Sequence, residues 1–151
     1  MEETRENLSV QKLLMSVSHA YFVSLYHQLK ELGVHPGQVP LLFLLEREDG
    51  LSQKEIAARL GLSAPTVTMS IRRLEKGEFV TRRQDENDQR VSRICLSGKG
   101  RDCTARMQEI FDDNEKKLTR GFRETELCLF HRFCEQLKEN IQTLEGGNRE
   151  R

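Results

Sequence analysis

Side chains suited to reading base pairs gather on one segment, residues 63–76. An arginine can donate two hydrogen bonds to guanine, and methyl groups of small side chains can contact thymine. At about 100° per residue in a helix, Val67, Ile71 and Leu74 share one face, which favours their burial. The opposite face and its flanks carry Pro65, Thr66, Thr68, Met69, Arg72, Arg73 and Lys76. An exposed strip of this composition is typical of a helix that enters the major groove of DNA.

A second candidate is the polar stretch QDENDQRVSR, residues 84–93, which is too polar for a core. It is either a solvated loop or a loop that carries one arginine to a particular place. Its acids would repel phosphate unless they pair within the protein. We expect them to pair with Arg82, Arg83 or Arg90.

Residues that typically start and end helices precede the helix that would carry the base-reading strip. Ser52 is a good N-cap, and Glu55 three residues later completes a capping box. Gly61 can adopt the left-handed conformation that ends a helix. Ser63 caps the next helix, and Gly77 stops it. Two short helices joined by a turn with glycine predict a helix-turn-helix, with a plain helical hairpin as the alternative.

The polar stretch lies between two strand-like runs, residues 79–81 and 91–96, which predict a β-hairpin directly after the base-reading helix. Further helices are expected at residues 8–32, 37–48, 98–120 and 124–145. The predicted fold is mainly α with a small β-hairpin wing: a winged helix-turn-helix flanked by long N- and C-terminal dimerisation helices. We assign residues 36–97 to the DNA-binding domain, and residues 1–35 and 98–151 to the helical dimerisation region.

Composition narrows the classes of function. The chain has 151 residues, 32% of them charged, with a formal net charge of zero. Residues 52–93 hold nine lysines and arginines against six acids, so this segment is basic and the remainder acidic. No apolar run is long enough to cross a membrane, and the acidic start MEETREN is not followed by the apolar region of a signal peptide, so we do not expect secretion. We expect a cytoplasmic protein with no membrane association.

The ionisable residues do not predict an enzyme. The sequence contains no nucleophile elbow, no phosphate-binding loop and no paired catalytic carboxylates. Its four cysteines and four histidines lack the spacing of a metal site, so we expect neither a metal nor a cofactor. In a cytoplasmic protein Cys95, Cys103, Cys128 and Cys134 would be reduced thiols, either buried or acting as redox sensors.

Taken together, the elements resemble the MarR family of bacterial winged helix-turn-helix transcription regulators. The resemblance covers nearly the whole chain and is strongest over residues 51–100. Its most specific part is a wing pattern, D-x-x-D-x-R followed after five residues by L-[ST]-x-x-G. This chain matches the pattern at Asp85, Asp88, Arg90, Leu96, Ser97 and Gly100.

The resemblance implies a homodimer that binds palindromic double-stranded DNA and regulates transcription. The major-groove helix would use Ser63, Ala64, Pro65, Thr66, Thr68, Met69, Arg72 and Arg73, and base contacts are expected above all from Thr66, Thr68 and Arg72. Arg90 would enter the minor groove, held by Asp88. Gln53 and Lys54 would meet phosphates, or are plain solvated residues.

Regulation is also suggested by the resemblance. A repressor released by a small aromatic or phenolic effector is the first expectation, with a transcriptional activator or a thiol-responsive sensor of the same fold as alternatives. The candidate pocket residues are His19, Phe22, Tyr26, Val39 and Phe43, for each of which core packing is the competing interpretation. No cysteine precedes Cys95, so the oxidant sensing that some relatives perform near the start of the first helix is not supported.

Overall fold

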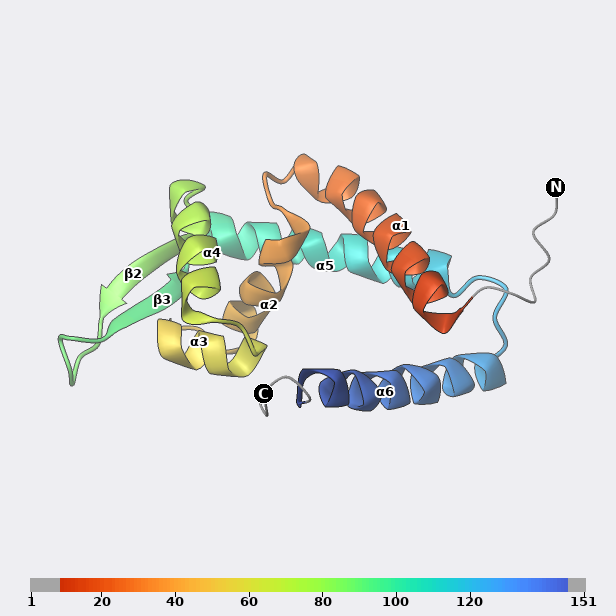
Figure 1. Ribbon diagram of the computed structural model, residues 1–151. Helices are drawn as coiled ribbons and strands as arrows, with labels where there is room; N and C mark the ends of the chain where they lie inside the picture. Colours follow the sequence, from red (N-terminus) through yellow and green to blue (C-terminus); the bar gives the residue numbers. More distant parts are fainter. Residues whose placement is uncertain (1–8, 147–151) are drawn as a thin grey trace. The chain divides into compact units, whose positions relative to one another are not determined.

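The computed structural model describes residues 9–146, which form helices and a β-hairpin (Figure 1). The chain divides into two units, one ending at Ile110 and the other beginning at Phe111. Residues 1–8 and 147–151 of the predicted dimerisation region lie outside the described residues. No helix within residues 9–146 combines the length and the apolar character that a membrane span requires.

The first unit contains most of the elements. In chain order they are α1 (Val10–Lys30), the 3-10 helix η2 (Pro36–Gln38), α2 (Val39–Arg47), β1 (Leu51–Ser52), α3 (Gln53–Leu60), α4 (Ala64–Lys76), β2 (Val80–Gln84), β3 (Ser92–Leu96) and the first half of α5 (Gly98–Leu118). The second unit contains the end of α5 and α6 (Glu124–Gly146). The mainly helical fold with a small wing is confirmed.

The sheet has one strand more than predicted. Its order is β1-β3-β2, and both pairings are antiparallel. The hairpin pairs Val80 with Leu96 and closes at Gln84 and Ser92. The additional strand, β1, pairs Leu51 with Ile94 and Ser52 with Arg93. The helix-turn-helix therefore joins the sheet immediately before α3 begins.

The predicted helix caps at α3 are present. The hydroxyl of Ser52 accepts from the Glu55 amide at 3.2 Å, while the Glu55 carboxylate accepts from the Ser52 amide at 2.8 Å. Gly61 ends α3 with φ of 62°, a left-handed conformation. The hydroxyl of Ser63 accepts from the Thr66 amide at 3.4 Å and caps α4. These local signals suffice to define the two helices of the motif.

The end of α4 shows why a glycine follows the helix. Gly77 itself has an ordinary φ of −81°, and the left-handed residue is Glu78, with φ of 63°. A Cβ atom on Gly77 would lie 2.7 Å from the Phe79 ring. Gly77 therefore ends α4 by leaving room for that buried ring.

The core of the first unit lies beneath the inner face of α4. Val67, Ile71 and Leu74 are fully buried, as their spacing predicted. They share the core with apolar side chains of α2, α3, β3 and α5, namely Leu42, Leu45, Ile56, Ile94 and Met107. This burial leaves the opposite face of α4 in solvent.

Candidate nucleic-acid interface

The outer face of α4 is an exposed strip. Ser63, Ala64, Pro65, Thr66, Met69, Arg72 and Arg73 are all exposed, and Thr68 is half-buried. The side chain of Met69 is 48% exposed, so the strip also presents an apolar side chain to solvent. No salt bridge within residues 9–146 involves Arg72 or Arg73. Their guanidinium groups can therefore donate to an external acceptor.

The two threonines already make hydrogen bonds within the protein. The Thr68 hydroxyl lies 3.0 Å from the amide oxygen of Gln53 and 2.9 Å from the Ala64 carbonyl oxygen. The Thr66 hydroxyl lies 2.8 Å from that of Ser63. Thr68 thus links α4 to the first residue of α3, a connection that spacing did not predict. Because Gln53 accepts through its oxygen, its NH2 group remains a donor at the start of α3.

The tip of the wing is closed by backbone hydrogen bonds. The Asp85 amide donates to Val91 and the Val91 amide donates to Asp88, at 3.0 and 2.9 Å. One carboxylate oxygen of Asp85 accepts from the amides of Asn87 and Asp88. The Asp88 carboxylate accepts from the Arg90 amide at 3.0 Å. Asp88 therefore holds Arg90 through its backbone, and this leaves the guanidinium exposed.

The expected pairing of the wing acids with Arg82, Arg83 or Arg90 is wrong for Asp85. Asp85 pairs instead with Arg93, whose Nε lies 2.6 Å from its carboxylate. Arg82 pairs with Glu75 of α4 through two nitrogens, at 2.6 and 3.1 Å. The reason is the register of the sheet: β3 brings Arg93 beside the loop that follows β2, whereas Arg82 faces α4.

Arg93 and its two acids form the most connected charged group of the interface. Nη1 of Arg93 lies 2.7 Å from the Glu55 carboxylate. Hydrogen bonds from Arg93 and from the amides of Asn87 and Asp88 lower the pKa of Asp85. Hydrogen bonds from Ser52 lower the pKa of Glu55, and the charge of Arg93 adds to this. Both carboxylates are therefore ionised at neutral pH.

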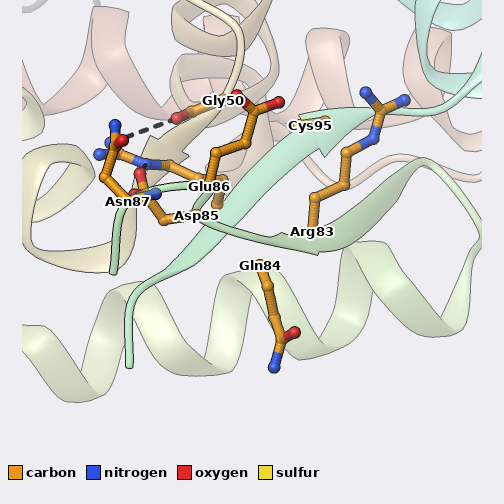
Figure 2. Close-up of a pocket in the computed structure, with 8 residues that line it drawn as sticks. Gly50, Arg83, Gln84, Asp85, Glu86, Asn87 and Cys95 are labelled. Carbon is orange, nitrogen blue, oxygen red and sulfur yellow. Dashed lines mark hydrogen bonds and ion pairs between the residues drawn. The ribbon is translucent and has the colours of Figure 1, made fainter. Parts of the chain in front are cut away.

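A hollow of about 310 Å³ lies beside this group, lined by residues of the wing together with Gly50 and Cys95 (Figure 2). Figure 2 shows Asp85, Glu86 and Asn87 near Gly50, and Arg83 and Gln84 pointing away from them. The lining carries both signs of charge. It gives no indication of a single charged ligand.

The candidate effector residues are only partly brought together. The rings of Phe22 and Tyr26 lie edge-on to that of His35, with centroids 5.7 and 5.9 Å away. His35 was not among the predicted pocket residues; it caps η2, its Nδ1 accepting from the Gly37 amide. Val39 is buried, Phe43 is half-buried, and His19 is exposed on α1.

The cysteines differ in exposure. Cys95 and Cys103 are buried, Cys134 is half-buried and Cys128 is exposed. Burial raises the pKa of the Cys103 thiol, although the charges of Arg106 and Lys99 oppose this. Within residues 9–146 no three His, Cys, Asp or Glu side chains form a group able to hold a metal ion.

Part of this chain is similar in sequence to known proteins. The model of the MarR family matches residues 34–92. YwoH of Bacillus subtilis, named as an HTH-type transcriptional regulator, is 40% identical over 70 residues, covering 46% of this chain and 50% of that protein. TtmR of Methylorubrum extorquens, named likewise, is 40% identical over 82 residues, covering 54% and 40%. This chain thus spans about half the length of these curated relatives or less.

Solved structures resemble a larger share of the chain. The crystal structure of MarR superposes with a TM-score of 0.73 at 26% identity, covering 94% of this chain and 97% of that one. The Staphylococcus aureus MepR–DNA complex superposes with a TM-score of 0.70 at 26% identity, covering 92% and 96%. The similarity therefore extends from the winged region into the flanking helices.

Proposed function

We propose that this chain, whose residues 34–92 match the model of the MarR family, is a homodimeric transcription regulator that binds palindromic double-stranded DNA. The observation that carries the proposal is Arg90 at the wing tip, on the hairpin that directly follows the exposed strip of α4. Its guanidinium is exposed and makes no ion pair within residues 9–146. A similar protein, MepR, has been solved as a DNA complex. The protein would bind this DNA in the cytoplasm.

The proposed contacts divide into three kinds. The exposed face of α4 enters the major groove, where Arg72 and Arg73 can donate to bases or phosphates. The major-groove helix comprises Ser63, Ala64, Pro65, Thr66, Thr68, Met69, Arg72 and Arg73. Arg90 enters the minor groove, and Asp88 orders the turn that presents it. Gln53 and Lys54, at the start of α3, contact phosphates.

A second copy of the chain completes the DNA-binding unit. Large apolar side chains are exposed on α1 and on α6, an indication of a protein interface. On α6 they are Leu129, Phe130, Phe133, Ile141 and Leu144. Two winged domains held in this way would meet successive major grooves about 34 Å apart, which explains the preference for a palindrome.

The proposed regulation is repression relieved by a small aromatic or phenolic effector near Phe22 and Tyr26. An effector that binds better to a dimer with misplaced recognition helices would shift the population away from the DNA-binding form. Activation would follow from the same linkage if the effector bound better to the DNA-binding form of the dimer. The thiol-sensor alternative finds little support at Cys103, because burial and a raised pKa disfavour its reactive thiolate.

The test is selective DNA binding and its dependence on salt. Duplex from the region upstream of the chain's own gene is compared with random duplex, using wild type, Arg90→Ala and Arg106→Ala. Arg106 is an exposed arginine of α5 and controls for loss of charge. We expect Arg90→Ala to weaken binding about tenfold and to reduce the salt slope by about one. Equal binding of wild type to both duplexes would overturn the proposal.

A further inference from the structure

One arginine connects three separate segments of the winged domain. Nε of Arg93, on β3, lies 2.6 Å from the Asp85 carboxylate in the wing loop. Nη1 lies 2.7 Å from the Glu55 carboxylate in the first turn of α3 and 3.5 Å from the Gly50 carbonyl oxygen before β1. A single planar group therefore links the wing to the helix-turn-helix.

Each of the two acids is itself fixed. The Glu55 oxygen that accepts from Arg93 also accepts from the Ser52 amide, so it belongs to the capping box of α3. The other oxygen of Asp85 accepts from the amides of Asn87 and Asp88, which form the turn before Arg90. Because a guanidinium donates in fixed directions, the contacts of Arg93 hold the wing tip in a defined position relative to α3.

Arg93 also stands where the sheet loses its third strand. The β1 strand pairs with β3 at Ile94 and Arg93, and the hairpin continues beyond this point with the single pair Gln84 and Ser92. A two-stranded ribbon twists more freely than a wider sheet and is marginally stable alone. The contacts of Arg93 therefore restrain the hairpin where its own pairing is weakest.

We propose that Arg93 is a positioning residue that sets the wing relative to α3 and α4, so that Arg90 and α4 can engage one DNA duplex together. This inference rests on the proposed function. Arg93 acts through Arg90, and its guanidinium is already committed to Asp85 and Glu55. Partly exposed ion pairs contribute only modestly to global stability, so the main effect of Arg93 is on DNA binding.

The test is whether Arg90 contributes less to DNA binding when Arg93 is absent. The DNA probe is a duplex that wild-type protein selects from a randomised library. We expect Arg90→Ala to weaken binding about tenfold in the wild-type background and about twofold or less in the Arg93→Ala background. Arg83→Ala removes the same charge from the same hairpin. In that background the effect of Arg90→Ala should stay near its full size.

Two further variants separate geometry from charge and from folding. Arg93→Lys keeps the charge but lacks the fork, so it should reproduce the loss seen in Arg93→Ala. If Arg93→Ala is too unstable, Glu55→Gln removes one ion pair while its amide oxygen can still accept from Ser52. Full binding by Arg93→Lys, or an equal cost of Arg90→Ala in both backgrounds, would overturn the inference.

A measurement without DNA keeps the two proposals distinguishable. Hydrogen exchange of the Asn87 and Asp88 amides, which Asp85 holds, should accelerate several-fold in Arg93→Ala and remain unchanged in Arg83→Ala. If wild type selects no sequence from the library, the proposed function fails, and the exchange result still reports on the restraint. If exchange is the same in Arg93→Ala and wild type, the restraint itself is absent and the inference fails.

Discussion

A Cβ atom on Gly100 would lie 2.0 Å from the carbonyl oxygen of Phe79. That oxygen also accepts from the Ser97 amide at 3.0 Å, and the Ser97 hydroxyl accepts from the Gly100 amide at 2.9 Å. The first turn of α5 therefore rests directly on the backbone at the start of the hairpin. The L-[ST]-x-x-G part of the wing pattern has a structural cause, which is this close approach.

Substitution of Gly100 should accordingly be costly. Gly100→Ala must displace α5 from Phe79, and overpacking of this kind costs about 1–3 kcal/mol or more. Gly98→Ala is the matched control, because no atom lies within 4 Å of its added Cβ and alanine is the better helix former by about 1 kcal/mol. Urea unfolding at one protein concentration should show loss of stability in the first variant and none in the second. Equal midpoints would mean that α5 can move away without cost.

The pairing of Asp85 with Arg93 should make stability depend on pH in the acid range. The pKa of Asp85 is lowered in the folded chain, so its contribution is complete above the unfolded value of about 4 and is lost as pH falls through the folded pKa. Unfolding of wild type and Asp85→Asn should therefore differ at neutral pH and converge in strong acid. The stability of Asp102→Asn, a substitution on an exposed part of α5, should show no such pH-dependent difference from wild type. A difference that does not shrink as pH falls below the unfolded value would contradict the assignment.

The cysteines should react in the order of their exposure. Burial raises the pKa of Cys103, which lowers its thiolate fraction at neutral pH, and burial also shields the sulfur from reagents. We expect iodoacetamide to modify Cys103 more slowly than the exposed Cys128 in the folded protein, as measured by peptide mass spectrometry. In urea the difference should disappear. Equal rates in the folded protein would revive Cys103 as a redox sensor.

The parts of the fold that depend on neighbours in the chain were predictable. Ser52 and Glu55 form a capping box within one turn, and Gly61 ends the helix, because each acts on backbone groups a few residues away. The burial of one face of α4 follows from helical periodicity. These local rules were enough to place the helix-turn-helix and the hairpin.

The missed features depend on contacts between distant residues. The β1 strand is two residues long, and its pairing partner Ile94 lies more than forty residues later. Glu55 and Arg93 are 38 residues apart, so their ion pair depends on the register of β3, which polar residues in the wing do not determine. Likewise, the hydroxyl of Thr68 meets Gln53 only after α3 and α4 have packed. Most of these polar residues stand out in the sequence, but their partners do not follow from it.

The proposed dimer can be tested at Phe130 of α6, which is 56% exposed in the single chain. Burial of a phenylalanine side chain contributes about 1.5–3 kcal/mol, and a twofold interface contains each such contact twice. In the dimer, Phe130→Glu would remove this contribution from both subunits and would bury two negative charges at the interface. Sedimentation equilibrium should therefore show monomers at concentrations where wild type is dimeric.

Gln136→Glu is the control for that experiment, because it adds the same charge to an exposed polar position of α6. It should remain dimeric. A monomeric Phe130→Glu should also lose its preference for a palindrome, since one winged domain reads one half-site, while its far-ultraviolet circular dichroism should keep the helical signal. If Phe130→Glu stays dimeric at the same concentrations as Gln136→Glu, the exposed apolar face of α6 does not form the interface.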